Sequence, residues 1–111
     1  MTVQHAGLAA GRWNELTLCE QLGNIGSEIG RAISAGKRNN DKRKEDALKR
    51  AFELFDLTAA DQRWKGSKRR EVLRSRELTS DFFYGDNEYN QTAALVENYF
   101  MQFAMAARIN R

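Results

Sequence analysis

The sequence predicts an all-α protein, a four-helix up-down-up-down bundle that assembles as a homo-oligomer. Apolar residues recur at spacings of three and four along four stretches, which is the period of an amphipathic helix. Alternation of apolar and polar residues never persists for the length of a strand, and no proline interrupts a helix. Short polar segments join the stretches, and short connections favour antiparallel neighbours. We assign residues 1–12 to a flexible N-terminal lead-in and residues 13–111 to a single domain.

The first helix is expected to begin after Thr17 and to end near Gly36. Thr17 and Glu20 have the spacing of a capping box, in which each side chain accepts a hydrogen bond from the other residue's backbone N–H. Gly36 suits the left-handed position that ends many helices. The apolar face of this helix consists of Leu18, Leu22, Ile25, Ile29 and Ile33.

A second face of small residues runs beside the apolar face of the first helix. It consists of Gly23, Gly26, Ser27 and Gly30. Each glycine inside a helix costs roughly 1 kcal/mol relative to alanine, so we expect a neighbouring helix to press closely against this face. The expected partner is the last helix, whose bulky side chains include Tyr99, Phe100 and Phe103. The alternative is a helix that simply tolerates its glycines.

The second and third helices are expected over residues 42–60 and 68–83. Asn40 or Asp41 is expected to cap the second helix, and Ser67 the third. The expected core of the second helix is Leu48, Ala51 or Phe52, Phe55 and Ala59, flanked by Leu54 and Leu57. The expected core of the third helix is Val72 or Leu73, the stem of Arg76, Thr79 and Phe83, with Leu78 and Phe82 alongside.

A fourth helix is expected over residues 88–109, after a turn in which Gly85 ends the third helix. Its apolar side chains spread over too wide an arc for one face: Leu95, Tyr99, Phe100, Met101, Phe103, Met105 and Ala106. A bundle of this size covers only part of such an arc, and the remainder predicts self-association. A few apolar residues tolerated on the surface are the alternative.

The composition offers little for catalysis. The single histidine, His5, falls in the lead-in, so we expect no histidine-based metal site or catalytic triad. No phosphate-binding loop motif occurs, and the place of Cys19 on the apolar face is typical of a structural thiol. We therefore expect no enzymatic activity, no metal and no cofactor. The single cysteine, and the lack of an apolar run near 18 residues, predict a cytoplasmic protein without a membrane span.

Positive charge is concentrated in the middle of the chain. Of 18 Lys and Arg residues, 14 fall between Lys37 and Arg76, in two clusters of seven. The first cluster is Lys37, Arg38, Lys42, Arg43, Lys44, Lys49 and Arg50. The second is Arg63, Lys65, Lys68, Arg69, Arg70, Arg74 and Arg76, with Trp64 interleaved. In an up-down bundle the second cluster lies at the same end as both termini, close to Arg12, Arg108 and Arg111.

This basic end predicts contact with nucleic acid, because phosphates that are neutralised by a protein release their counterions. The expected phosphate-binding residues are Arg63, Lys65, Lys68, Arg69, Arg70, Arg74, Arg108 and Arg111. Trp64 is expected to stack on a base. The alternative is a solvated basic loop, with Trp64 folded down on the bundle as a lid and Arg76 in a buried ion pair.

Four segments resemble a family of small, uncharacterised helical proteins of bacteria and archaea. They are W-N-E-L-T-L-C-E-Q-L-G-N-I-G-S-E-I-G-R-A (Trp13 to Ala32), A-F-E-L-F-D-L-T-A-A-D-Q-R-W (Ala51 to Trp64), D-F-F-Y-G-D-N-E-Y-N (Asp81 to Asn90) and Y-F-M-Q-F-A-M-A-A-R (Tyr99 to Arg108). The resemblance covers most of the chain after Trp13 but implies no function.

At the level of fold alone, a basic four-helix bundle of this size is similar to two other groups of proteins. These are the accessory variability proteins of diversity-generating retroelements and the bundle proteins encoded in 23S rRNA intervening sequences. The first similarity implies a ring-forming oligomer that binds nucleic acid and a reverse transcriptase. No site residue follows from either similarity.

The function predicted from the sequence is that of a non-enzymatic accessory subunit that binds nucleic acid, RNA rather than DNA, through its basic end. The alternative is an adaptor that engages a protein partner, such as a reverse transcriptase or another protein encoded nearby. An adaptor would use the glycine face of the first helix and the aromatic fourth helix. Whether the first basic cluster takes part stays open.

Overall fold

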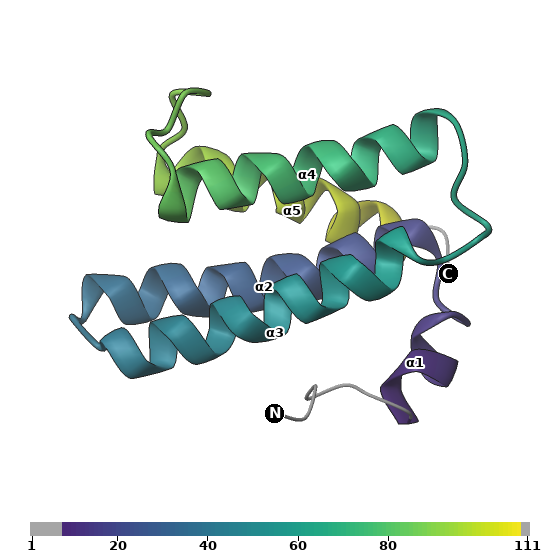
Figure 1. Cartoon of the computed structure of the whole chain (residues 1–111), viewed down its shortest axis with the longest axis horizontal. Coiled ribbons are helices and arrows are strands. Elements are labelled where there is room, and N and C mark those ends of the chain that lie inside the picture. Colours follow the sequence, from purple (N-terminus) through teal and green to yellow (C-terminus); the bar gives the residue numbers. More distant parts are fainter. Residues whose placement is uncertain (1–7, 110–111) are drawn as a thin grey trace.

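The chain folds into helices joined by short connections (Figure 1). The computed structural model describes residues 8–109, and within that range it contains no strand. The elements are α1 (Leu8–Trp13), α2 (Leu18–Lys37), α3 (Asp41–Ala59), α4 (Ser67–Tyr84) and α5 (Ala93–Ile109). The prediction of an all-α protein with four main helices is confirmed.

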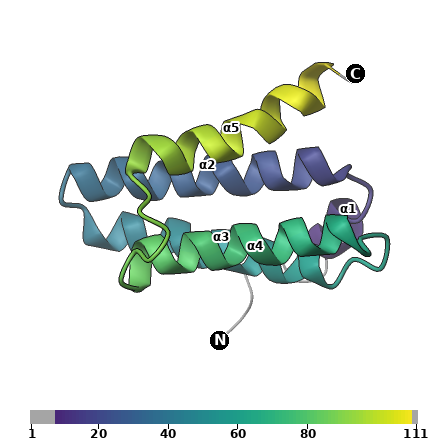
Figure 2. The same cartoon turned by 90° about the horizontal axis from the view of Figure 1, so that it is seen from above.

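The four main helices lie in two layers, and consecutive helices run in opposite directions (Figure 1). Helices α2 and α3 pack against each other, α5 packs on α2, and α4 packs on α3. Seen from above, the C-terminal half of α5 diverges from the rest of the molecule (Figure 2). The alternating order agrees with an up-down bundle, but α4 and α5 do not close against each other along their length.

Helix α2 begins as its local sequence predicts. The Glu20 N–H donates to Thr17 Oγ1 at 3.1 Å, and the Thr17 N–H donates to Glu20 Oε1 at 2.9 Å, which completes the capping box. Leu22, Ile25 and Ile29 are fully buried. The capping box therefore confirms the predicted start of α2, and the burial of these residues confirms its predicted apolar face.

The end of α2 differs from the expectation. Gly36 stays helical, and Asn39 takes the left-handed conformation instead, with φ of 58°. Asparagine tolerates that region because its short amide can bond locally, so α2 continues to Lys37, one residue past Gly36, before the chain reverses. Asn40 then caps α3 as expected, accepting from the Arg43 N–H at 3.2 Å.

The start of α4 also differs from the expectation. Ser67 is the first helical residue rather than the cap, and Gly66 precedes it with φ of 61° and ψ of −127°. Glycine adopts such a backbone without the strain that a β-carbon would bring. No side chain caps the N-terminus of α4.

The last helix starts at Ala93, five residues later than predicted, although Gly85 ends α4 as expected. Asn87 and Asn90 both have positive φ, 53° and 52°, which excludes a helix there. The Asn87 side chain forms two hydrogen bonds with the backbone of Gln91: it accepts from the Gln91 N–H and donates to the Gln91 carbonyl, both at 2.8 Å. Thr92 Oγ1 then accepts from the Leu95 N–H at 3.2 Å.

The main hydrophobic core lies between α2, α3 and α5. Its fully buried side chains are Leu22, Ile25, Ile29, Ala51, Phe55 and Val96. Of the alternatives left open, Ala51 and Val72 are buried, whereas Phe52 is half-buried and Leu73 is exposed. Ala59 and Phe83 are only half-buried, and Leu95, one of the apolar residues on the wide arc of the last helix, is 49% exposed. Its neighbour Val96 is fully buried, so Leu95 lies on the side of α5 that faces away from the core.

The glycine face of α2 receives α5, as predicted. A β-carbon on Gly26 would lie 2.5 Å from Phe100 Cβ, and one on Gly23 would lie 3.1 Å from Ala104 Cα. The two glycines therefore let α5 approach closely, with Phe100 filling the space above Gly26. Gly30 has no atom within 4 Å of the corresponding position, because α5 does not cover it.

A short helix, α1, lies at the end of the segment expected to be a flexible lead-in, residues 1–12. Residues 8–13 form α1, whereas His5 lies outside the described residues. Trp13, 7% exposed, is buried against the core and donates through Nε1 to Thr58 Oγ1 at 2.9 Å. A buried indole with a satisfied N–H fixes the path of the chain into α2.

Candidate nucleic-acid interface

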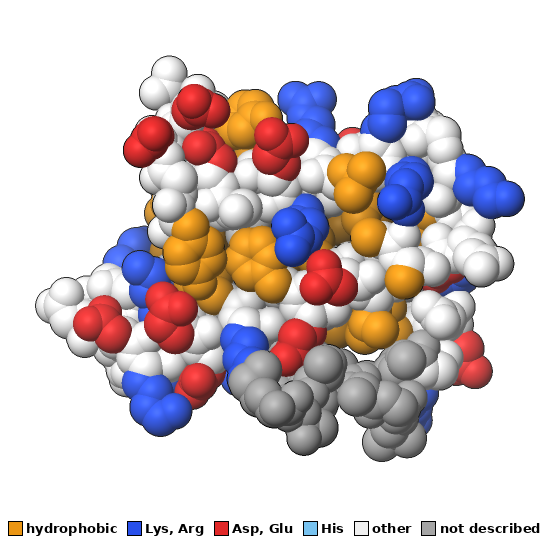
Figure 3. Space-filling model, viewed as in Figure 1, with side chains coloured by type: hydrophobic (Ala, Val, Ile, Leu, Met, Phe, Trp, Pro, Cys, Tyr) orange, Lys and Arg blue, Asp and Glu red, His pale blue; other side chains and the backbone are white. Residues whose placement is uncertain are grey.

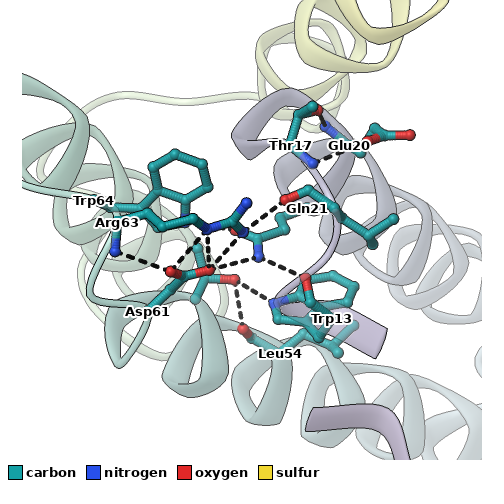
Figure 4. Close-up of polar contacts among 10 residues, drawn as sticks. Trp13, Thr17, Glu20, Gln21, Leu54, Asp61, Arg63 and Trp64 are labelled. Carbon is teal, nitrogen blue, oxygen red and sulfur yellow. Dashed lines mark hydrogen bonds and ion pairs between the residues drawn. The ribbon is translucent and has the colours of Figure 1, made fainter. Parts of the chain in front are cut away.

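Trp64, the aromatic residue of the second basic cluster, is built into a buried polar network (Figure 4). Its indole Nε1 donates to Gln21 Oε1 at 2.7 Å. The Gln21 amide nitrogen donates in turn to the Trp13 carbonyl at 2.9 Å and to Asp61 Oδ2 at 3.3 Å. Gln21 therefore joins the α1–α2 connection to the α3–α4 connection from a fully buried position on α2.

Asp61 and Arg63 form an ion pair within the α3–α4 connection. Arg63 donates from Nε at 3.0 Å and from Nη2 at 2.7 Å to the two oxygens of Asp61, and its Nη2 also donates to the Leu16 carbonyl at 2.7 Å. Burial alone would raise the pKa of Asp61, but the hydrogen bonds from Arg63 outweigh it and lower that pKa. The charge of Arg63, an exposed residue, is therefore paired with the buried carboxylate of Asp61.

This geometry changes the roles expected of Arg63 and Trp64. Trp64 is 8% exposed, with the Arg63 guanidinium 4.3 Å and the Lys68 ammonium 5.5 Å from the centroid of its ring. A ring covered in this way offers no open face for a base. The alternative, in which Trp64 folds down as a lid, is the arrangement observed.

Cations crowd the N-terminus of α4. Its first turn contains Lys68, Arg69 and Arg70 and no acidic residue, and all three side chains are exposed. The N-terminus of a helix already bears positive partial charge and free N–H groups. Cations there lower the stability of the isolated helix and, together with those N–H groups, favour an anion. Arg69 already makes one hydrogen bond within the protein, since its Nη1 donates to the Ala59 carbonyl at 2.7 Å.

The basic surface continues along the first half of α4. In Figure 3 the Lys and Arg side chains gather over this half and the connection before it, whereas Asp and Glu gather where α4 ends. We define the α4 basic surface as Lys65, Lys68, Arg69, Arg70 and Arg74, all of which are exposed. Glu71 is the acidic residue between Arg70 and Arg74; it is half-buried and accepts a hydrogen bond from the Tyr99 hydroxyl, so the exposed charge on this half of α4 is mainly positive.

Other predicted residues do not join this surface. Arg108 lines the groove beside Gly23 and Gly30, and the end of α5 that carries it lies across α2 from α4 (Figure 2). Arg76 pairs with Asp56 at 3.4 Å, but that pair is largely exposed rather than buried. Arg12 is exposed on α1, and Arg111 lies outside the described residues.

Sequence reasoning missed the buried polar residues of the network that holds Trp13 and Trp64 in place. Gln21, Thr58 and Asp61 are buried polar residues from three separate segments. A signal existed for two of them, since Gln21 precedes Leu22 on the apolar face and Thr58 follows Phe55 by three positions. A polar residue at a core position of a helix indicates a buried hydrogen-bond partner elsewhere in the fold.

Comparisons of the chain with protein-family models, with curated proteins and with solved structures found no match. Among residues 8–109, no helix is both long and apolar enough to cross a membrane.

Proposed function

We propose that the protein is a non-enzymatic accessory subunit that binds RNA through the α4 basic surface. The observation that supports this proposal is the set of five exposed cations around a helix N-terminus that has no capping side chain and no acidic residue in its first turn. Phosphate oxygens satisfy both the cations and the free N–H groups.

Binding at this surface depends on phosphates rather than on bases, because the Trp64 ring is covered. We therefore expect weak sequence preference and strong dependence on salt. We expect RNA rather than DNA from the resemblance, drawn from the sequence, of a basic four-helix bundle to retroelement accessory proteins and to the bundle proteins of rRNA intervening sequences; this is an analogy of fold.

Fluorescence polarisation tests the proposal directly. The full-length protein is titrated into a labelled single-stranded RNA and, separately, a duplex DNA, over a salt series. If the five cations of the α4 basic surface each neutralise a phosphate, the slope of log K against log salt for the RNA is roughly −3.5. The variant Lys68→Glu/Arg70→Glu is expected to abolish binding while its helical circular dichroism stays unchanged.

A matched control at the other end of the molecule separates this surface from overall charge. Lys42→Glu/Lys44→Glu makes the same change in net charge on α3, outside the α4 basic surface, and is expected to keep most of the affinity. No binding of either nucleic acid at low salt, or equal affinity in the α4 double variant, would reject the proposal.

We further propose that the four main helices form an up-down bundle and that the protein self-associates, so that a second copy covers the outer face of α5. Met101, Met105 and Ile109 follow one another at a spacing of four on this helix and are 52%, 53% and 78% exposed. Apolar side chains in a row on one face favour burial against another copy. Sedimentation at several protein concentrations tests this; Met105→Glu is expected to shift an oligomer to monomers.

An adaptor that binds a protein partner is the second candidate function. The partner could be a reverse transcriptase or another protein encoded nearby. The glycine face is not free for such a partner, since Phe100 and Ala104 of the same chain occupy it around Gly26 and Gly23. An adaptor would therefore use the exposed row on α5, and a complex that survives high salt would favour it over RNA binding.

A further inference from the structure

A hollow lined by arginines lies between the second half of α2 and the first half of α3. Its volume is about 340 Å³, and two small side chains in its lining, Ala35 and Ala47, are each 1% exposed. Four arginines line it: Arg31 on α2, Arg38 directly after α2, and Arg43 and Arg50 on α3. Small side chains at the helix–helix contact leave the space, and long cationic ones surround it.

A buried carboxylate positions two of these arginines. Glu28, whose side chain is 8% exposed, accepts from Arg31 Nη1 at 2.5 Å and from Arg50 Nε at 2.6 Å. Burial alone would raise the pKa of Glu28, but the hydrogen bonds from Arg50 and Arg31 outweigh it and lower that pKa. Each guanidinium has five N–H donors, so both keep donors for another acceptor.

The other two arginines are not neutralised. Neither Arg38 nor Arg43 forms an ion pair or a side-chain hydrogen bond with another described residue. The carboxylate that lines the hollow, Asp46, lies 3.2 Å from the ammonium of Lys42. Four guanidinium groups around one hollow repel each other, and an anion placed among them relieves that repulsion.

We propose that this hollow, the arginine pocket, binds the phosphate group of a small phosphate ester or diphosphate. Planar guanidinium groups match phosphate oxygens with paired hydrogen bonds, which ammonium groups do not. The volume is near the lower end of the range for small-molecule sites, about 300–1,000 Å³. It therefore suits a compact phosphorylated group rather than a long polyanion.

The arginine pocket is independent of the α4 basic surface. The α2–α3 turn and the N-terminus of α4 lie at opposite ends of the molecule (Figure 1). None of the residues of the α4 basic surface lines the pocket. Failure of RNA binding at α4 therefore leaves this proposal standing, and the converse also holds.

Isothermal titration of the full-length protein with pyrophosphate at low ionic strength tests the pocket. We expect saturable binding of one pyrophosphate per chain. Arg38→Gln/Arg43→Gln removes two unpaired guanidinium groups and leaves Glu28 with its partners, and it is expected to weaken binding by about tenfold or more. The matched control Arg12→Gln/Arg108→Gln removes two exposed guanidinium groups outside both the pocket and the α4 basic surface, and it is expected to leave pyrophosphate binding unchanged.

A second variant tests the pocket without removing an arginine. Ser34 lines the hollow at an exposed position of α2. Ser34→Asp places a carboxylate among the guanidinium groups, so it is expected to weaken pyrophosphate binding and to raise Tm in the absence of ligand. No saturable binding by the wild type, or equal affinity in both pocket variants, would overturn the proposal.

Competition with short RNAs distinguishes the source of the phosphate. Displacement of pyrophosphate by an RNA with a 5′-monophosphate, but not by the same RNA with a 5′-hydroxyl, supports the pocket and assigns it to nucleic-acid ends. Displacement by neither RNA supports the pocket and assigns it to a free small molecule. Displacement by both RNAs would overturn the assignment to a terminal phosphate.

Discussion

The Trp64 indole N–H donates to Gln21 Oε1 at 2.7 Å, and both side chains are buried. This bond joins residues 43 positions apart and holds the α3–α4 connection against the start of α2. The aromatic residue of the most basic part of the chain is therefore a structural element. The cations beside it are the groups left for a ligand.

Trp64→Phe is expected to destabilise the protein without weakening RNA binding. Phenylalanine keeps most of the buried ring but removes the N–H, which leaves Gln21 Oε1 unpaired at a cost of roughly 1–3 kcal/mol. Urea unfolding measures the loss of stability, and fluorescence polarisation on the folded variant measures affinity. A large loss of affinity with unchanged stability would show that the ring contacts the ligand.

Gly26→Ala is expected to destabilise the packing of α5 on α2. The added β-carbon would lie 2.5 Å from Phe100 Cβ, so α5 must shift or the Phe100 side chain must move. Overpacking of this kind costs about 1–3 kcal/mol, measured by thermal or urea unfolding.

Gly30→Ala is the matched control, with nothing within 4 Å of its added methyl group. It is expected to stabilise α2 by up to about 1 kcal/mol, since alanine is the better helix former. Equal effects of the two substitutions would contradict the close approach of α5 at Gly26.

Arg70→Glu is expected to raise stability and to weaken RNA binding at the same time. A carboxylate in the first turn of α4 replaces a cation at the positive end of the helix dipole, a gain of about 0.3–1 kcal/mol. The same change removes a phosphate contact. Thermal unfolding and polarisation, measured on one preparation, report the two effects.

Arg74→Glu makes the same change in charge beyond the first turn of α4. We expect it to weaken RNA binding without the gain in stability, because the dipole effect falls off within a turn. A gain in stability equal to that of Arg70→Glu would show that relief of general repulsion, rather than the helix terminus, explains the effect.

The Asp61–Arg63 pair is expected to make stability fall in acid. The pKa of Asp61 is held below its ordinary value of 3.8 in the folded state. Its contribution is therefore fully present above about pH 4 and is lost as the pH falls through the lowered pKa. Asp61→Asn is expected to lower the free energy of unfolding at pH 7 by about 1–3 kcal/mol and to flatten its decline in acid.

Urea unfolding between pH 7 and pH 2 measures this dependence. Arg63→Gln removes the donor rather than the acceptor, and it should reduce the same acid dependence. An Asp61→Asn protein that loses stability in acid as steeply as the wild type would contradict the linkage. The pKa of Glu28 is also lowered, so Glu28 too contributes stability that is lost in acid. Glu28→Gln, measured in the same pH series, separates the contributions of the two carboxylates.

Several features followed from short segments of sequence. The capping box of Thr17 and Glu20, the Asn40 cap and the apolar face from Leu22 to Ile29 depend on residues within one or two turns of each other. Their geometry is decided locally, so spacing alone predicts it. The packing of bulky α5 residues on glycines of α2 was also predictable, because three glycines in one helix need a compensating contact.

Other features depend on residues that only the tertiary structure brings together. Trp64 changes from an expected stacking platform to a buried lid because Gln21, 43 positions away, accepts its N–H. Arg50 turns toward Glu28 on the neighbouring helix and so helps to line a pocket that neither helix forms alone. The sequence specifies the charge and the size of each side chain. Its partner is decided by the packing of helices, because hydrogen bonds and ion pairs between helices depend on separations of a few ångströms that local spacing does not specify.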